Sequence, residues 1–311
     1  MSSQHLVMKT RKLSSSLGIW KTIFQKTPNA SPFLSHEWFT ALCQLWKTDP
    51  DIMVFWKDDN PVGILPGTVE NRMVKFIGDE RVTDLIDIMY FPDCKEDIIM
   101  TLASKITSEE WHVDLFPLEM NSPIVQHLPN YITDARIEES ELSPLLLLPD
   151  SWDEYLKNLN GKHRHELRRK MKKIDGLVVR EMESQQIDIL FRLMAASSKK
   201  KKEFLSEEMR AFFTDIVNSF SQKGWLRFHV TFVDSLPIGA LLSFRFGDCV
   251  YLYNMGFNTD FQHLSPGIIS IALDIELAIK EEVRYYDFLR GAERYKFDLG
   301  AERRYTKRVR R

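Results

Sequence analysis

Several side chains able to move protons or bind anions follow one predicted strand near the end of the chain. The strand is expected at Arg284–Leu289, and the residues in question are Asp287, Arg290, Glu293, Tyr295 and Lys296. General acid–base catalysis needs a group that accepts a proton and a group that donates one. We therefore predict Glu293 as a base and Tyr295 as a proton donor. Arg290 and Lys296 are predicted to bind anionic groups of a substrate, and the competing interpretation is surface charge around a buried tyrosine.

A second candidate site lies where a predicted strand ends and a helix begins. The strand ends with Met255, Gly256 and Phe257. The next helix opens with Ser265, Pro266, Gly267 and Ile268. Glycine in a strand permits the close approach of another backbone. Serine suits an N-cap and proline a first helical turn, where the unpaired N–H groups and the helix dipole favour an anion. An ordinary helix start is the alternative.

A basic helix predicted within Trp152–Ile174 carries a third set of candidates. Its apolar stripe begins at Leu167 and identifies the packing side of the helix. Arg164 lies one turn before Leu167 and Arg168 one turn beyond Arg164, at the edge of this face. We predict that both arginines bind a substrate phosphate or carboxylate. The run Lys199–Lys202 is expected to be an exposed connection, with guidance of a phosphorylated substrate as the alternative.

No metal site is predicted. His163 and His165 have no acidic or cysteine partners at ligand spacing, and His36 has no second histidine at such spacing. The basic tail Arg303–Arg311 is expected to be a solvated or disordered end. Contact of this tail with nucleic acid or anionic lipid is the alternative.

The order of the expected elements indicates a mixed α/β protein with two domains, residues 1–150 and 151–311. Those of the first domain are a helix within Pro32–Trp46, a hairpin at Ile52–Thr68, strands near Val74 and Leu85, a helix within Asp93–Thr107, a strand at Trp111–Phe116, and strand-like runs near Tyr131 and Leu145. Those of the second are a helix through Trp152–Ile174, a strand at Leu177–Met182, helices within Gln185–Ser197 and Ser206–Ser221, an antiparallel meander of Trp225–Val233, Pro237–Phe246 and Cys249–Phe257, a helix at about Pro266–Glu282, a strand at Arg284–Leu289, and a short helix around Ala292–Leu299. Asp84 and Asp87 flank the expected strand end near Leu85, where their role stays open.

Composition limits the classes of protein that fit. The chain has 311 residues, of which 44% are hydrophobic and 28% charged, so it is able to bury large cores. A net charge of −2 gives no global field that would recruit nucleic acid or an anionic membrane. The three cysteines are far apart, which fits a reducing compartment. The N-terminus lacks the apolar core of a secretory signal, and no stretch approaches the ~18 apolar residues of a membrane span, so a cytoplasmic location is expected.

Sequence blocks along nearly the whole chain resemble the Fem-related proteins of the GNAT superfamily, in the group that includes cellulose-biosynthesis CelD-like acetyltransferases. The blocks are SPFLSHEWFTAL (Ser31–Leu42), FIGDERVTDLID (Phe76–Asp87), KHRHELRRKMKK (Lys162–Lys173), YLYNMGFNTDFQHLSPGIIS (Tyr251–Ser270) and YYDFLRGAERYKFDLGAERR (Tyr285–Arg304). The resemblance implies two GNAT-like domains in tandem, with the acyltransferase site in the second.

The resemblance also implies a reaction. An acyl group, acetyl first among the candidates, would move from acyl-CoA to an amine of a sugar, nucleotide-sugar or envelope or polysaccharide precursor. The pantetheine arm would pair with a splayed strand at Met255–Phe257, and the pyrophosphate would bind at the helix start after Pro266. The acceptor would bind in an interdomain cleft, with Arg164, Arg168 and Arg290. Family loops have more glycines and amides than this one, so a different thioester or an aminoacyl donor remains an alternative.

Two further functions stay open. Fem relatives transfer an amino acid from aminoacyl-tRNA, which would make tRNA a partner. The slightly negative net charge and the lack of a recognisable coiled-coil arm argue against that alternative. A non-catalytic polysaccharide-assembly module with a decayed donor site is the other, and the atypical loop favours it.

Overall fold

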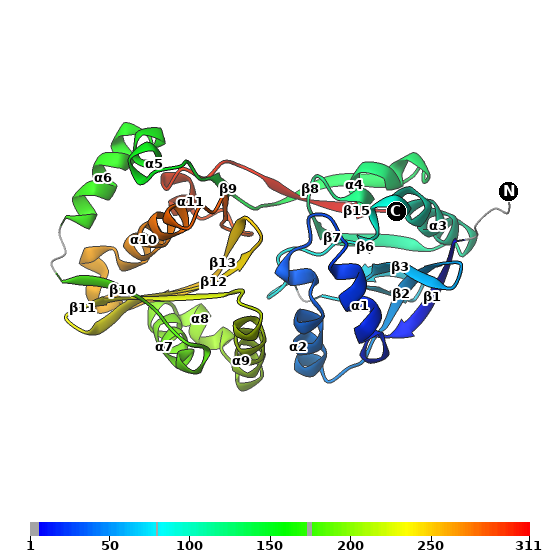
Figure 1. The fold of residues 1–311 in the computed structure, drawn as a ribbon, viewed down its shortest axis with the longest axis horizontal. Coiled ribbons are helices and arrows are strands. Elements are labelled where there is room, and N and C mark those ends of the chain that lie inside the picture. The colour runs from blue at the N-terminus through cyan, green and yellow to red at the C-terminus, as the bar shows by residue number, and fades with distance from the viewer. Residues whose placement is uncertain (1–5, 79, 173–175) are drawn as a thin grey trace. The chain divides into compact units, whose positions relative to one another are not determined.

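The chain folds into two compact units, one of Met1–Glu141 with Tyr305–Arg311 and one of Leu142–Arg304 (Figure 1). They are called unit 1 and unit 2 below. The computed structural model describes residues 6–78, 80–172 and 176–311. Each unit combines β-sheet with helices, so the predicted mixed α/β class is confirmed. The predicted ranges 1–150 and 151–311 differ from the two units in two places, because residues 142–150 belong to unit 2 and the C-terminal Tyr305–Arg311 belongs to unit 1.

Unit 1 contains two sheets, in the strand orders β1-β2-β3-β6 and β4-β5-β7-β15-β8. Its elements are β1 (Leu6–Lys12), α1 (Leu17–Phe24), α2 (His36–Trp46), β2 (Asp51–Lys57), β3 (Asn60–Leu65), β4 (Gly67–Glu70), β5 (Met73–Phe76), β6 (Met89–Tyr90), α3 (Lys95–Ser108), β7 (His112–Leu118), α4 (Pro123–His127), β8 (Arg136–Leu142) and β15 (Tyr305–Arg310). α2 begins at His36 because the Ser35 hydroxyl accepts the Trp38 N–H at 3.2 Å and caps the helix.

Two strands expected in unit 1 do not form. Near Leu85 the chain has no regular structure, because the N–H of Ile86 donates to the Pro117 carbonyl and that of Ile88 to the Asp87 carboxylate. Near Tyr131 a 3₁₀ turn at Leu128–Asn130 replaces the expected strand.

The C-terminal tail is an inner strand of a sheet, so the prediction of a solvated or disordered end is wrong. β15 pairs antiparallel with β7, and its residue Val309 is fully buried. Its charges have partners within unit 1: Arg308 donates to Asp114 at 2.7 Å and Lys307 to Glu139 at 2.8 Å. The partners lie far away along the chain, which is why the sequence of the tail alone reads as unpaired charge.

Unit 2 is built on one six-stranded sheet with the strand order β10-β11-β12-β13-β14-β9. Its elements are β9 (Leu145–Leu147), α5 (Trp152–Asn158), α6 (Gly161–Met171), β10 (Leu177–Glu181), α7 (Asp188–Ser197), α8 (Lys199–Phe204), α9 (Glu207–Gln222), β11 (Leu226–Val233), β12 (Leu236–Phe246), β13 (Cys249–Phe257), α10 (Pro266–Lys280), β14 (Tyr285–Asp287) and α11 (Arg294–Asp298). The meander β11-β12-β13 is antiparallel as predicted, and β14 joins β13 in parallel.

Helices cover both faces of this sheet (Figure 1). Gly239 on β12 packs against Ser270 of α10, and Gly256 on β13 packs against Met194 of α7. α5, α6, α10 and α11 contribute to one apolar core on the α10 side. The single helix predicted over Trp152–Ile174 is two, because the Asn160 side chain caps α6 by accepting the Lys162 N–H at 3.0 Å.

A buried polar network attaches α10 to the sheet. Asp274 of α10 is 1% exposed and accepts hydrogen bonds from Arg227 (3.0 Å), His229 and Tyr286 (2.7 Å). Arg227 also pairs with Glu281 at the end of the same helix. Because all three donors come from strands of the sheet, Asp274 fixes the position of α10 over it.

No helix in the described ranges combines the length and the apolar character needed to cross a bilayer. Cys43, Cys94 and Cys249 are all free thiols.

Candidate active site

The edge of β13 separates from β14 at the end predicted to bind a donor. The two strands pair at Cys249–Tyr251 with Tyr285–Asp287 and no further, whereas β13 remains paired with β12 as far as Phe257. On the β12 side, the Asn258 N–H donates to the Ile238 carbonyl at 2.9 Å. Because bonding direction alternates along an antiparallel strand, the backbone groups of Met255 and Phe257 point toward the opened edge.

At this edge, the backbone N–H and carbonyl of Met255 form hydrogen bonds with side chains and not with a neighbouring strand. Its N–H donates to Asn254 Oδ1 at 3.0 Å, and its carbonyl accepts a hydrogen bond from the Lys201 ammonium. A ligand with its own amide groups is able to displace such side chains without unfolding any strand.

Lys201 contacts the candidate donor site, which the sequence did not reveal. The run Lys199–Lys202 was expected to be an exposed connection, but it forms α8, and Lys201 points inward from it. Burial lowers the pKa of Lys201, and the Glu293 charge partly opposes that effect. Four consecutive lysines carry no sign of which one is buried, so only the fold distinguishes Lys201.

Gly256 permits the close approach of another backbone, as predicted, but that backbone belongs to α7 of the same chain and not to a ligand. A Cβ at this position would lie 2.3 Å from the Met194 nitrogen and 2.5 Å from the Leu193 carbonyl carbon. The backbone of α7 therefore occupies the space that was expected to admit a ligand, and Gly256 acts by letting α7 pack on the sheet.

The start of α10 lies beside the opened edge. Pro266 is the first helical residue as predicted, whereas Ser265 has a left-handed backbone (φ 57°) and its side chain makes no cap hydrogen bond. The N–H of Ile269 bonds to the Ser265 carbonyl, which leaves the first-turn N–H groups of Gly267 and Ile268 directed out of the helix. A Cβ on Gly267 would lie 2.8 Å from Met255 Cε. The fold thus brings the two parts of the predicted donor site together.

Lys296 stabilises the loop after β14, which carries Arg290 and Glu293. The lysine is 3% exposed, and its ammonium donates to the carbonyls of Leu289 (3.2 Å), Arg290 (2.9 Å) and Gly291 (3.2 Å). It also pairs with Glu293 at 3.0 Å. With its donors used internally, Lys296 is better described as a structural residue than as the predicted ligand of a substrate anion.

Glu293 keeps an exposed carboxylate in a defined position. Its side chain is 56% exposed, although it contacts Lys296. Gly291 has a φ of 124°, and a Cβ there would lie 2.3 Å from Glu293 Oε2. Glycine at position 291 therefore supplies both the turn and the space for the carboxylate. The geometry suits a base that approaches its substrate from the surface.

Tyr295 lies next to Glu293 in chain order, with a half-buried ring that packs against Phe288. Burial, and then the Glu293 charge, raises the pKa of Tyr295 well above its usual value. A phenol is protonated at neutral pH even at its ordinary pKa, and the higher pKa makes Tyr295 a weaker acid.

The remaining candidates take different positions. Arg164 donates to the Lys157 carbonyl at 3.2 Å, and Arg168 is exposed. His163 Nε2 lies 3.2 Å from Asp298, so the first turn of α6, which carries Arg164, adjoins α11. Both arginines remain predicted substrate ligands.

Asp287 and Arg290 have contrasting environments. Asp287 is buried and accepts hydrogen bonds from Arg304 at 2.6 Å and from the Leu289 N–H at 2.8 Å, so its role is structural. Arg290 is half-buried and remains a predicted anion ligand.

Comparison with known proteins matches a large part of unit 2 to one family. Residues 161–297 match the family described as "Acetyltransferase (GNAT) domain". No curated protein matches the chain.

Several solved structures share the fold of the whole chain. FemX is similar with a TM-score of 0.66 and 11% identity, over 94% of this chain and 95% of FemX. The C-terminal domain of a candidate lysylphosphatidylglycerol synthetase from Agrobacterium fabrum is similar with a TM-score of 0.62 and 11% identity, over 96% and 92%. A tandem GNAT protein from the clavulanic acid biosynthesis pathway has a TM-score of 0.52 and 11% identity, over 98% of both chains. The likeness supports the predicted pair of GNAT-like domains, and at this identity it concerns the fold alone.

Proposed function

Since residues 161–297 are a GNAT acyltransferase domain within a Fem-like fold, we propose that the protein transfers an acyl group, acetyl first among the candidates, from acyl-CoA to an amine. The proposed acceptor is a sugar, nucleotide-sugar or other envelope or polysaccharide precursor. The observation that carries the proposal is the opened edge of β13 next to the start of α10.

Each part of the proposed donor has a counterpart in this site. Amides of the pantetheine arm would pair with the backbone of Met255 and Phe257, in place of the strand that β14 does not supply. The pyrophosphate would accept hydrogen bonds from the N–H groups of Gly267 and Ile268, where the dipole of α10 also favours negative charge.

The proposed chemistry is direct attack. The acceptor nitrogen forms a bond to the thioester carbonyl carbon and gives its proton to Glu293. The carbon–sulfur bond then breaks, and the thiolate takes a proton from Tyr295 as the amide product forms. Arg164, Arg168 and Arg290 are the proposed ligands for anionic groups of the acceptor.

Calorimetric titration with acetyl-CoA tests the donor site. We expect micromolar affinity for the natural protein and a loss of at least about tenfold for Gly267→Glu, because the new carboxylate repels the pyrophosphate at the helix start. The substitution is sterically feasible because the nearest atom to the new Cβ is the flexible end of Met255.

A matched control adds the same charge to the start of another helix. Gly18 is the second residue of α1, and a Cβ there has no atom within 4 Å. Gly18→Glu should leave acetyl-CoA binding unchanged. Failure of the natural protein to bind acetyl-CoA would contradict the acyl-CoA proposal and favour a different donor or a non-catalytic role.

Replacing Lys201 by methionine is expected to tighten acetyl-CoA binding by about three- to tenfold, because the donor no longer has to displace a charge-assisted hydrogen bond from the Met255 carbonyl. Titration of both proteins measures this change. Lys200→Met, which removes the same charge from an exposed neighbour, should have no effect. Weaker binding by Lys201→Met would instead indicate that the ammonium contacts the donor.

A second candidate function is aminoacyl transfer from aminoacyl-tRNA, as in Fem relatives. The start of α10 favours it, because Pro266 removes one of the N–H groups that the pyrophosphate of acyl-CoA would use. Transfer of radiolabelled amino acid from charged tRNA to an acceptor, without acyl-CoA, would support this function over the first.

A further inference from the structure

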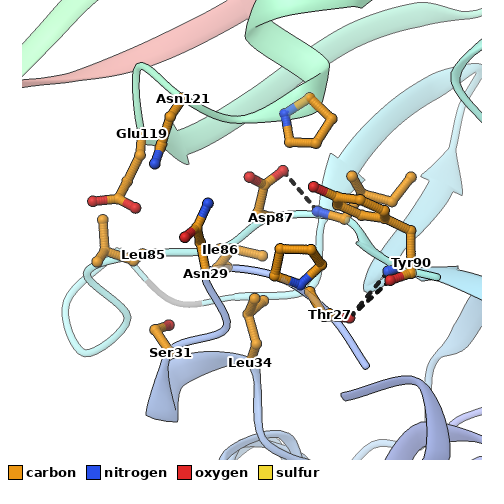
Figure 2. A pocket seen from close by; sticks show the side chains of 13 residues that line it. Thr27, Asn29, Ser31, Leu34, Leu85, Ile86, Asp87, Tyr90, Glu119 and Asn121 are labelled. Carbon is orange, nitrogen blue, oxygen red and sulfur yellow. Dashed lines mark hydrogen bonds between the residues drawn. The ribbon is translucent and has the colours of Figure 1, made fainter. Parts of the chain in front are cut away.

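Two side chains whose pKa values are shifted by burial, Asp87 and Lys201, differ in the groups that bind them. Asp87 lies in the unit 1 pocket shown in Figure 2, where its carboxylate accepts the Ile88 N–H at 2.7 Å and the Ser122 hydroxyl at 2.8 Å. Lys201 bonds instead to the Met255 carbonyl, a group that the proposed donor needs. Of the two, Lys201 alone has to exchange its partner when a donor binds.

The short helix α8 fixes the backbone of Lys201. The Ser198 hydroxyl caps this helix by accepting the Lys201 N–H at 3.2 Å, and the Lys201 carbonyl accepts the Leu205 N–H at 3.2 Å. The ring of Phe204, at the end of α8, packs edge-on against Phe213 of α9. Because the backbone is held in this way, the amino group stays near the opened edge of β13 after a donor has displaced it.

Lys201 also lies close to the proposed base. Burial lowers the pKa of Lys201, and the nearby charge of Glu293 opposes that effect in part. The lowered pKa leaves a larger fraction of the amine neutral than in an exposed lysine, and the neutral amine is the nucleophile in amide formation. One amine with nucleophilic character thus lies beside the donor edge and near a carboxylate that is able to accept its proton.

We propose that Lys201 is itself acylated by the donor bound at this edge when no other acceptor is present. The neutral Nζ forms a bond to the thioester carbonyl carbon, and the carbon–sulfur bond breaks. The nitrogen gives one proton to Glu293, and the thiolate takes one from Tyr295, as in the proposed transfer to a free amine. The products are an amide at Lys201 and coenzyme A. The inference rests on the proposed function, since it needs acyl-CoA in the site.

Proximity is the physical reason for a reaction at Lys201 and not at its neighbours. An amine held next to a bound thioester reacts as if its concentration were far above that of a free amine. Lys199, Lys200 and Lys202 are exposed and meet acyl-CoA from solution. An amide, unlike a thioester, does not pass the acyl group on, so the reaction stops after one acyl group per chain.

Intact-mass measurement of the full chain after incubation with acetyl-CoA tests the proposal. We expect the natural protein to gain the mass of one acetyl group when no acceptor is added. Cleavage after glutamate releases the peptide Ser184–Glu203, and its fragmentation spectrum should place the acetyl group on Lys201. Lys199, Lys200 and Lys202 lie in the same peptide as internal controls and should carry at least about tenfold less acetyl.

Variants distinguish acylation at the donor edge from acylation in solution. Gly267→Glu, which is designed to weaken acetyl-CoA binding, should carry at least about tenfold less acetyl on Lys201, whereas Gly18→Glu should react like the natural protein. Glu293→Gln should slow the reaction at least about tenfold, because the proton acceptor is lost. Lys201→Arg keeps a cation beside the Met255 carbonyl and should gain no acetyl group.

Titration of the same proteins with acetyl-CoA separates failure of this inference from failure of the proposed function. If the natural protein bound acetyl-CoA but Lys201 stayed unmodified, the inference would be wrong and the donor site would stand. Equal labelling of Lys200 would assign the reaction to acetyl-CoA in solution and overturn the inference. Undiminished labelling of Lys201 in a Gly267→Glu protein that no longer binds acetyl-CoA would do the same. Absence of binding to the natural protein would contradict both proposals.

Discussion

Replacing Glu293 by glutamine is expected to lower kcat for acyl transfer by about 10²- to 10⁴-fold, because the amide cannot accept the proton of the attacking amine. The affinity for acetyl-CoA should stay unchanged, since the proposed donor contacts come from β13 and α10. Steady-state kinetics with an amine acceptor, together with titration of acetyl-CoA, measures the two quantities separately.

The position of Glu293 next to Lys296 requires a control for folding. Glutamine preserves the size of the side chain, and melting curves of both proteins show whether the loop has changed. Glu302→Gln removes an exposed carboxylate from the same unit and should retain the natural kcat. If Glu293→Gln retained activity within about twofold, another group would have to act as the base.

Replacing Asp274 by alanine is expected to lower the free energy of unfolding of unit 2 by about 3–5 kcal/mol. The change removes the acceptor of Arg227, His229 and Tyr286 and leaves buried donors without their partner. Urea unfolding followed by tryptophan fluorescence measures the difference. Glu276→Ala on the same helix breaks a partly exposed pair with Lys280, which should cost no more than about 1 kcal/mol.

The hydrogen bonds of Asp274 also predict that the folded protein loses stability at low pH. Burial alone would raise the pKa of Asp274, but the charge of Arg227 and the hydrogen bond from His229 outweigh it, so the pKa is lowered. A carboxyl group with a lowered folded pKa contributes its full stability above its unfolded pKa of about 4 and loses it as the pH falls toward the folded value. Unfolding measured between pH 7 and pH 3 should show this loss in the natural protein and a smaller one in Asp274→Ala. Equal acid sensitivity of the two proteins would contradict the role assigned to the network.

Several parts of the candidate site could be read from local sequence. Pro266 and the glycine after it predict a helix start, because proline lacks the N–H that a first turn leaves unpaired. Alternation of apolar residues predicts the meander that ends at Phe257. A polar residue within the apolar stretch of α10 is also a usable signal, since a buried Asp274 requires partners. The sequence does not say which residues those partners are.

Two features that the sequence did not reveal depend on distant contacts, and a third depends on the conformation of a local loop. Lys201 differs from Lys200 only in reaching the Met255 carbonyl. The ammonium of Lys296 is surrounded by the carbonyls of Leu289, Arg290 and Gly291, which are near in the chain but meet it only because the loop folds back. The tail at Tyr305–Arg310 reads as loose charge until β7 pairs with it.

The sequence by itself determined the mixed α/β class and the order of most strands and helices, because hydrophobic periodicity and turn residues act within a few positions of one another. The GNAT character of the second half was indicated by the resemblance of blocks such as Tyr251–Ser270 to that superfamily. Only the tertiary structure decided where β13 leaves β14, which lysine enters the interior, and that the C-terminal strand β15 pairs with β7. These features depend on pairing and burial between residues far apart in the chain, and the energy of a buried charge is set by neighbours that the local sequence does not contain.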